Sequence, residues 1–194
     1  SNSIEVENIG NTEWTVTANA QSVDGEDISG WVEFDSPRSK LLTEPGSSDD
    51  THVFTFDVTP DDSLEAGTQV AIGIQGRAGS EIGCEKILTV TVGQEFGASM
   101  ALSKSKLSNV EPGTSGTLSI QITNQGNGQE TMALGASGVP PGWQVSFSQS
   151  SVTLGSSQSS NNKETVGVDV FVPEDASAES DAVISFTVGR GGGS

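Results

Sequence analysis

Residues 166–173 read Val-Gly-Val-Asp-Val-Phe-Val-Pro, a stretch in which valine occupies every second position until a proline closes it. Successive side chains of a β-strand point to opposite faces of a sheet, so a period of two buries one face and exposes the other. Proline has no N–H to donate to a neighbouring strand, which explains why the run ends there. The stretch therefore predicts a half-buried β-strand.

The same period continues through most of the chain. Short alternating runs rich in β-branched residues are bounded by Gly, Pro, Asn and Asp, and no window of helical length has apolar residues at i, i+3, i+4 and i+7. The other clear runs are 4–7, 14–17, 53–58, 70–74, 87–92, 118–122, 145–147, 152–154 and 183–188. Short strands separated by turn residues predict an all-β fold of antiparallel sandwiches.

The pattern occurs twice. The turn sequence Asn-Ile-Gly-Asn at 8–11 reappears as Asn-Gln-Gly-Asn at 124–127. Three further matches pair Gly30-Trp31 with Gly142-Trp143, Val58-Thr59-Pro60 with Phe171-Val172-Pro173, and Gly76-Arg77 with Gly189-Arg190. The separations lie between 112 and 116 residues, a drift that insertions in loops would produce. We therefore predict two modules, residues 1–94 and 95–194, joined by a short hinge at 93–97. The side chains expected in the core are Trp31, Val53 or Phe54, Ile72 and Val90 in the first module, and Trp143, Ile120, Val168, Val170 and Phe186 in the second.

The two copies lack strands at opposite ends. In the second copy, residues 100–107 and a Pro-Gly turn precede the strand 118–122, whereas the equivalent strand 4–6 lies near the start of the sequence. The run 87–92 follows Gly76-Arg77, whereas only Gly-Gly-Gly-Ser follows Gly189-Arg190. We expect the first module to lack its opening edge strand and the second its closing one. Either the chain is a segment of a longer repetitive protein, or neighbouring subunits complete its sheets by strand donation, giving a head-to-tail filament.

Three stretches of the second copy support a resemblance. They are Asn-x-Gly-Asn at 124–127, Val-Pro-Pro-Gly-Trp at 139–143 and Val-Phe-Val-Pro-Glu-Asp-Ala at 170–176. They resemble the Ig-like modules of secreted and cell-surface bacterial and archaeal proteins, including the carbohydrate-binding Ig-like family associated with alpha-galactosidases. The resemblance covers residues 97–190 well and 3–94 more loosely. It implies two tandem Ig-like β-sandwiches in an extracellular or cell-surface protein, and it carries over no catalytic residue.

Two functions follow from this resemblance and the repeat. The first is a structural, adhesive repeat segment of an extracellular surface protein, filament or surface layer, whose partners are copies of itself or neighbouring Ig-like modules. The second is an accessory carbohydrate-binding module of a secreted glycoside hydrolase. Trp31 and Trp143 hold equivalent places, which favours a core role for both. Trp14 is the candidate for a partner or sugar surface, because the second copy has Glu130 in its place.

Charge restricts the partners further. The chain has 26 acidic and 8 basic residues and a net charge of −18, which would repel a nucleic-acid backbone. No apolar run approaches the roughly 18–20 residues of a membrane-spanning helix. A solvated acidic surface is the simplest interpretation, and calcium binding by acidic loops of the first module is the alternative, although no EF-hand pattern is present. The calcium candidates are Asp24, Glu26, Asp27, Asp49, Asp50, Asp61 and Asp62.

The residues needed for catalysis are scarce. His52 is the only histidine and Cys84 the only cysteine, too few for a typical zinc site. No Gly-x-Ser-x-Gly turn accompanies His52, so a serine nucleophile is not indicated. We predict that the protein is not an enzyme and needs no organic cofactor. Cys84 is interpreted as a small residue at the start of a strand, or alternatively as an exposed thiol.

Overall fold

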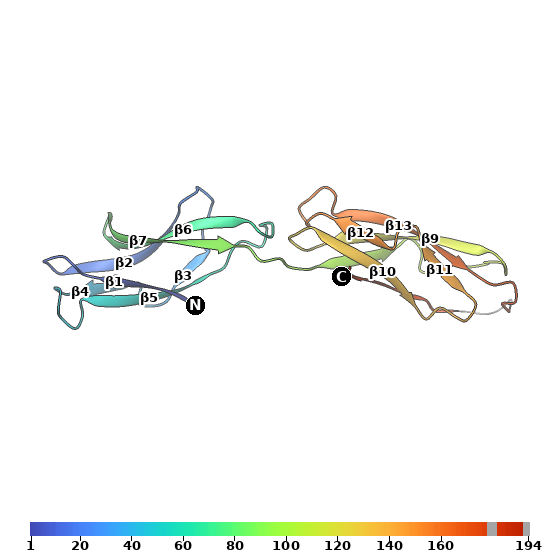
Figure 1. Cartoon of the computed structure of the whole chain (residues 1–194), viewed down its shortest axis with the longest axis horizontal. Helices are drawn as coiled ribbons and strands as arrows, with labels where there is room; N and C mark the ends of the chain where they lie inside the picture. The colour runs from blue at the N-terminus through green and yellow to red at the C-terminus, as the bar shows by residue number, and fades with distance from the viewer. Residues whose placement is uncertain (178–181, 192–194) are drawn as a thin grey trace. The chain divides into compact units, whose positions relative to one another are not determined.

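A computed structural model describes residues 1–177 and 182–191 of the chain (Figure 1). Every regular element in these residues is a β-strand, and all strand pairs are antiparallel. The all-β prediction is therefore confirmed. The chain divides into two compact units, here called unit 1 (residues 1–93) and unit 2 (residues 94–194).

Unit 1 consists of two sheets. The three-stranded sheet has the order β1-β5-β3, with β1 at Asn2–Glu7, β5 at Thr51–Val58 and β3 at Val32–Phe34. The four-stranded sheet has the order β4-β2-β6-β7, with β4 at Ser39–Leu42, β2 at Trp14–Ser22, β6 at Gln69–Ala78 and β7 at Glu81–Thr91. Side chains from both sheets form one apolar core.

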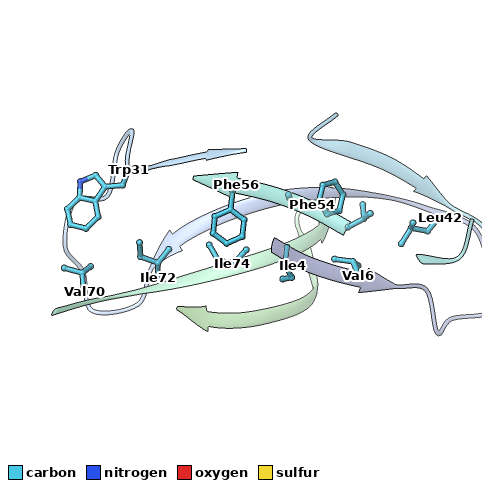
Figure 2. Packing of buried hydrophobic residues seen from close by; sticks show 11 residues of the cluster. Ile4, Val6, Trp31, Leu42, Phe54, Phe56, Val70, Ile72 and Ile74 are labelled. Atoms are coloured by element: carbon cyan, nitrogen blue, oxygen red, sulfur yellow. The ribbon is translucent and has the colours of Figure 1, made fainter. Parts of the chain in front are cut away.

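The core of unit 1 follows the period of two (Figure 2). Trp31, Phe54 and Ile72 are buried as predicted, and Val90 packs partly buried against them. Either Val53 or Phe54 was expected in the core; Val53 is 50% exposed, so Phe54 is the core residue. The full buried set is Ile4, Val6, Val16, Ala18, Trp31, Leu42, Phe54, Phe56, Val70, Ile72 and Ile74.

Unit 2 has the same two-layer construction. Its four-stranded sheet has the order β11-β13-β9-β8, with β11 at Gln144–Phe147, β13 at Lys163–Phe171, β9 at Ser115–Asn124 and β8 at Ala98–Leu102. Its three-stranded sheet has the order β12-β10-β14, with β12 at Ser151–Leu154, β10 at Glu130–Ser137 and β14 at Ser185–Arg190.

The predicted core of unit 2 is only partly correct. Ile120, Val168 and Val170 are buried, but Trp143 and Phe186 are half-buried against the edge of the core. The physical reason is position: Phe186 lies on β14 and Trp143 precedes β11, and each of these strands forms the end of its sheet. A side chain at the end of a sheet is covered by a neighbouring strand from one direction only.

A buried asparagine organises the turn after β1. Nδ2 of Asn8 donates to the carbonyl oxygens of Thr12 and Thr43 at 2.9 and 2.7 Å, and Oδ1 accepts from the N–H of Gly10 at 3.0 Å. The side chain thus bonds three main-chain groups that water does not reach easily, since Asn8 is only 2% exposed.

The equivalent asparagine of unit 2 makes the same three bonds. Nδ2 of Asn124 donates to the carbonyl oxygens of Gly128 and Gly155 at 2.8 and 2.7 Å, and Oδ1 accepts from the N–H of Gly126 at 2.9 Å. The framework β1-β5-β3 with β4-β2-β6 corresponds to β9-β13-β11 with β12-β10-β14. The Asn-x-Gly-Asn repeat in the sequence therefore encodes one hydrogen-bonded turn in two copies of one framework.

The strand pairs correct one of the repeat matches by a single residue. Arg77 lies opposite Thr17, and Gly189 lies opposite Ala133. Thr17 and Ala133 are equivalent when Asn8 is matched to Asn124, so Arg77 corresponds to Gly189 and not to Arg190. The same register matches residues 72, 74 and 76 of β6 with residues 184, 186 and 188 of unit 2. The Gly-Arg pairs look alike in the sequence but differ in which sheet face each residue occupies.

Candidate functional site: the open sheet edges

Each unit adds one strand to the shared framework, at a different place. In unit 1 the addition is β7 beside β6, and in unit 2 it is β8 beside β9. Among the described residues, β1 pairs only with β5, and β14 pairs only with β10. Within the described residues, β1 and β14 thus lack the outer neighbours that their equivalents β9 and β6 have, and they are open edges, as are β3, β4, β7, β8, β11 and β12. Open edges present main-chain donors and acceptors to which another strand can pair.

The hydrogen bonds of β10 show which groups of β14 point to the open side. The N–H of Leu134 donates to Ser150 at 2.9 Å, away from β14, although Leu134 lies directly opposite Val188. Leu134 and Val188 are therefore a non-hydrogen-bonded pair. Because such pairs alternate along an antiparallel ladder, the main-chain N–H and C=O groups of Phe186 and Val188 face away from β10.

The burial of equivalent residues shows what β7 does for unit 1. Ile72 and Ile74 lie on β6 between β2 and β7 and are 0% and 2% exposed. Their equivalents in unit 2, Ile184 and Phe186, are half-buried; β14 pairs with β10 on one side and with no described strand on the other. The core-facing side of β14 therefore has apolar surface that a further strand would cover.

The groups on the open side of β1 belong to different residues. The N–H of Asn8 donates to the carbonyl of Asp50 at 2.7 Å and continues the ladder between β1 and β5. Alternation along this ladder turns the main-chain groups of Ser3, Glu5 and Glu7 toward the open side. Two of these three residues carry a carboxylate on the exposed face of the sheet.

The edge at β1 also has less apolar surface left to cover. Ile4 and Val6 are 6% and 2% exposed although β1 has a single neighbour. In unit 2, where β8 does pair with β9, the uncharged Gln121 stands at the position equivalent to Glu5. Charged side chains along an edge are a common means of preventing strand addition. The edges at β1 and β14 are thus chemically unlike.

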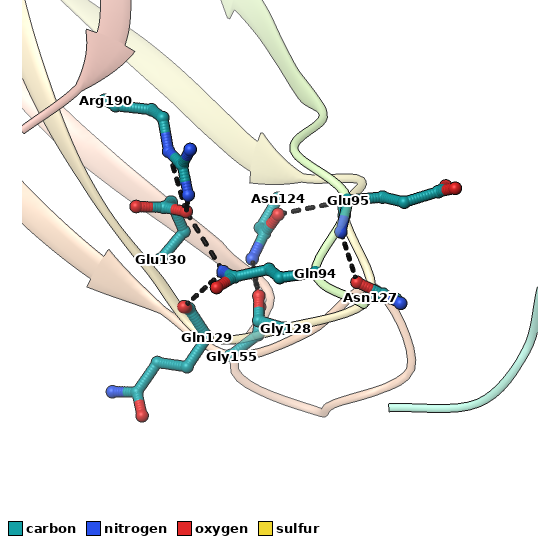
Figure 3. A network of polar contacts seen from close by, with 10 residues as sticks. Gln94, Glu95, Asn124, Asn127, Gly128, Gln129, Glu130, Gly155 and Arg190 are labelled. Carbon is teal, nitrogen blue, oxygen red and sulfur yellow. Dashed lines mark hydrogen bonds and ion pairs between the residues drawn. The ribbon is translucent and has the colours of Figure 1, made fainter. Parts of the chain in front are cut away.

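The first residues of unit 2 are bound to its surface (Figure 3). The N–H of Glu95 donates to Oδ1 of Asn127 at 2.8 Å, and Nε2 of Gln94 donates to the carbonyl of Gln129 at 3.2 Å. A Cβ on Gly126 would lie 2.3 Å from the carbonyl oxygen of Glu95, so only glycine permits this approach. The predicted hinge at 93–97 is therefore wrong for residues 94–97, which form part of unit 2.

The end of β14 is attached to these residues. Nη2 and Nε of Arg190 lie 2.8 and 3.2 Å from Oε2 of Glu130, and the guanidinium stands 5.4 Å from the ring centroid of Phe96. Gln94 Nε2 donates to the same carboxylate oxygen at 3.1 Å. The side chain of Glu130 is only 13% exposed, so this ion pair is less screened than a typical surface pair. The pairing holds the last residue of β14 in place.

Trp14, the predicted partner or sugar surface, lies at the start of β2. Its indole is half-buried and packs against the core of unit 1. A Cβ on Gly83 of β7 would lie 2.9 Å from Cη2 of Trp14, so the ring sits directly over that glycine. Glu130 stands at the equivalent place in unit 2, opposite Leu154 as Trp14 stands opposite Leu42. Trp14 therefore packs on β7, a strand that has no described equivalent in unit 2.

Four of the calcium candidates accept hydrogen bonds from main-chain N–H groups of unit 1, and three of them lie in the loops that follow β2 and β5. Asp24 accepts from the N–H of Ala71 at 3.0 Å and so attaches the loop after β2 to β6. Asp27 accepts from the N–H two residues ahead at 2.9 Å, and Asp61 does the same at 2.8 Å. These are the contacts by which aspartate stabilises turns.

Of the other candidates, Asp49 and Asp50 lie in the loop between β4 and β5, whereas Glu26 and Asp62 lie in the loops that follow β2 and β5. Asp50 accepts from the N–H of Gly46 at 2.7 Å, and Asp49 forms an ion pair with Lys40 at 3.6 Å. Glu26 and Asp62 have exposed side chains. Within residues 1–177 and 182–191, no three His, Cys, Asp or Glu side chains are grouped so that they could hold a metal ion. The structure thus does not assemble the seven candidates into a calcium site.

We expect unit 1 to lose stability in acid through these aspartates. The hydrogen bond from Ala71 lowers the pKa of Asp24 below its usual 3.8, and hydrogen bonds from Ser29 and Ser63 lower the pKa values of Asp27 and Asp61. A depressed pKa stabilises the fold above the unfolded value, and that stabilisation disappears as the pH falls through the folded value. The melting temperature of unit 1 should therefore fall below pH 3.8, measured by thermal unfolding across a pH series.

Asp24→Asn is the matched variant for this measurement. The amide oxygen still accepts from Ala71 but does not titrate, so the variant should lose less stability than the parent over the same acid range. Identical slopes in parent and variant would show that Asp24 does not contribute to the acid response.

Comparison with known proteins gave no match to any family model and none to a curated protein. No helix in the described part of the chain is long and apolar enough to cross a membrane.

Proposed function

We propose that this chain is a structural, adhesive segment of an extracellular surface protein, filament or surface layer, in which sandwiches of this kind join through their sheet edges. One observation carries the proposal: the same framework occurs twice, with an open edge at β1 in one copy and at β14 in the other. A repeated framework with exposed pairing groups is suited to assembly.

The strand order adds support for the Ig-like character of the modules. The order β8-β9-β13-β11 corresponds to the A-B-E-D sheet of immunoglobulin constant-type domains, and β10 with β14 corresponds to their C and F strands. In these terms unit 1 has the G-type strand β7 and unit 2 has the A-type strand β8. The frameworks differ from immunoglobulin domains in the extra strands β4 and β12.

The accessory carbohydrate-binding role is the weaker proposal. Unit 1 has a surface hollow of about 340 Å³ lined by Asp27, Phe34 and Arg38 among others, which has the polar groups that a sugar needs. A sugar ring would stack on an aromatic face. The guanidinium of Arg38 already stands 5.4 Å from the Phe34 centroid, however, and Phe56 packs against the same ring at 5.3 Å. A glycan array probed with the labelled chain would detect such binding and favour this alternative.

A non-catalytic role is part of the proposal. His52 lies on β5 with its ring edge-on to Phe54, at a centroid distance of 4.6 Å. Its main chain pairs with Val6 in the sheet. These contacts are those of a packing residue.

Static light scattering over a rising concentration series tests the proposal. The net charge of −18 opposes association, so the series should be repeated at high salt, where the repulsion is screened. We expect the mean mass to increase with concentration and with salt. A chain that remains folded and strictly monomeric throughout would contradict assembly through sheet edges.

A further inference from the structure

We infer that β14 is a strand-acceptor edge, which binds one extended polypeptide segment with alternating apolar side chains, antiparallel to β14, in the place that β7 has in unit 1. The inference rests on the proposed structural function. It adds which of the edges at β1 and β14 joins and what kind of segment joins it.

The acceptor properties of β14 come from its main chain and its core-facing side chains together. The outward N–H and C=O groups of Phe186 and Val188 pair with no strand of the described residues and can continue the ladder on the side away from β10. Ile184, Phe186 and Val188 are half-buried on the core side. The strand has six residues, and its only charged side chain, Arg190, is already paired with Glu130.

Unit 1 shows what a segment in this place looks like. On β7, Leu88 lies opposite Ile72 and Val90 opposite Val70, and both side chains pack against the core. Through the equivalence of Ile72 with Ile184, Leu88 would lie opposite Ile184 and Val90 opposite residue 182, just before β14 begins. Lys86 and Cys84, which lie opposite Ile74 and Gly76 in unit 1, would lie opposite Phe186 and Val188. The main-chain bonds supply affinity, and the alternate apolar side chains supply register, as in other cases of strand addition.

The four-stranded sheet of unit 2, which contains β8, also favours a segment with alternating apolar side chains. β14 and β8 belong to different sheets but contact each other, so a strand added beside β14 would also lie near β8. Met100 of β8 is half-buried there, and Leu102 is 42% exposed. Alternating apolar residues on the added strand would face this surface.

The edge at β1 does not offer the same site. Its outward main-chain groups belong to Ser3, Glu5 and Glu7, and its core-facing residues Ile4 and Val6 are already covered. A strand added there would gain little apolar burial and would meet two carboxylates. Of these two edges, we therefore assign strand acceptance to β14.

A synthetic peptide tests the assignment. The peptide has the sequence of residues 81–92 with Cys84→Ser, and it is titrated to millimolar concentration into the ¹⁵N-labelled full chain while amide exchange is followed by NMR. We expect exchange at Phe186 and Val188 to slow by roughly tenfold or more. Thr187 and Gly189 should be protected before and after addition, because their amides face β10.

A second peptide and two chain variants provide matched controls. The peptide with Leu88→Asp and Val90→Asp keeps the main chain but loses the apolar alternation, and it should not bind. Val188→Lys places a charge on the core-facing side of the edge and should abolish binding, whereas Thr187→Lys, on the exposed face of the same strand, should retain it. If Val188→Lys unfolds unit 2, the two peptides on the parent chain still decide the question.

The outcomes separate this inference from the proposed function. Unchanged exchange at Phe186 and Val188 with millimolar peptide would overturn the inference, as would protection at Glu5 and Glu7 instead. If the chain associates in light scattering while β14 remains unprotected, the structural proposal stands and the acceptor assignment is wrong. If the peptide protects β14 but the chain never associates, the assignment stands and assembly between copies is contradicted.

Discussion

Trp31→Ala should lower the free energy of unfolding of unit 1 by about 3–5 kcal/mol, the range observed when a large buried aromatic is truncated. Trp31 is 6% exposed and closes the end of the core near Val70 and Ile72 (Figure 2). Its main chain bonds to Ile28 and Thr59 at 3.0 and 2.8 Å, so the backbone is fixed and cannot easily collapse into the vacated space. A residual cavity raises the cost of truncation.

Trp143→Ala is the matched comparison in unit 2. The two tryptophans follow equivalent glycines, Gly30 and Gly142, which have φ values of 79° and 82°. Trp143 is only half-buried, so its truncation removes less apolar contact and should cost less than that of Trp31. Urea unfolding followed by circular dichroism would measure both variants. A Trp31→Ala chain that unfolds like the parent would show that the packing of this residue is not as described.

Asn124→Ala should destabilise unit 2 by about 3 kcal/mol or more, because an unpaired buried polar group costs about 1–3 kcal/mol and three are created. The substitution leaves the carbonyls of Gly128 and Gly155 and the N–H of Gly126 without their side-chain partner. Asn124 is 1% exposed, so water cannot readily replace these bonds. Chemical denaturation monitored by exchange of unit 2 amides is the appropriate measurement.

Asn124→Asp tests the chemical role of the amide. Aspartate keeps an oxygen acceptor for Gly126 but places a second oxygen against two carbonyls where Nδ2 had donated. We expect a loss comparable to that of the alanine variant at neutral pH, and a smaller loss in acid, where the protonated carboxyl can donate one bond. Asn8→Ala should have the same effect on unit 1. A neutral result for the alanine variants would contradict the importance of these networks.

The sequence alone was enough to predict the strands, because side-chain alternation is a local property of the backbone. The run of valines at 166, 168, 170 and 172 is observed as four buried residues on β13 and just beyond it. The Asn-x-Gly-Asn repeat likewise marked two turns correctly, since Asn8 and Asn124 bond to groups within four residues as well as across the unit. The two copies also have their strands in the same order along the sequence, and these strands form the same framework in both units.

The candidate site was visible in the sequence only in part. Because the two copies lack strands at opposite ends, the sequence predicts incomplete sheets at the strands that the structure shows as β1 and β14. The difference between them was not visible, because it depends on which main-chain groups face outward and on how much of each core-facing side chain a neighbour covers. The sequence predicts a hinge at 93–97 because nothing local indicates that Gln94 and Glu95 bond to a turn more than 30 residues away.

Strand position, turn chemistry and the twofold repeat were thus determined by the sequence itself. The tertiary structure decided which residues are covered: Phe54 is core but its neighbour Val53 is 50% exposed, and Phe186 is half-buried while the equivalent Ile74 is 2% exposed. It also dispersed the acidic residues over separate loops, where Asp24 and Asp50 bond to main-chain N–H groups. The physical reason is that periodicity states which face a side chain occupies, whereas burial depends on the strands that pack beside it and across from it.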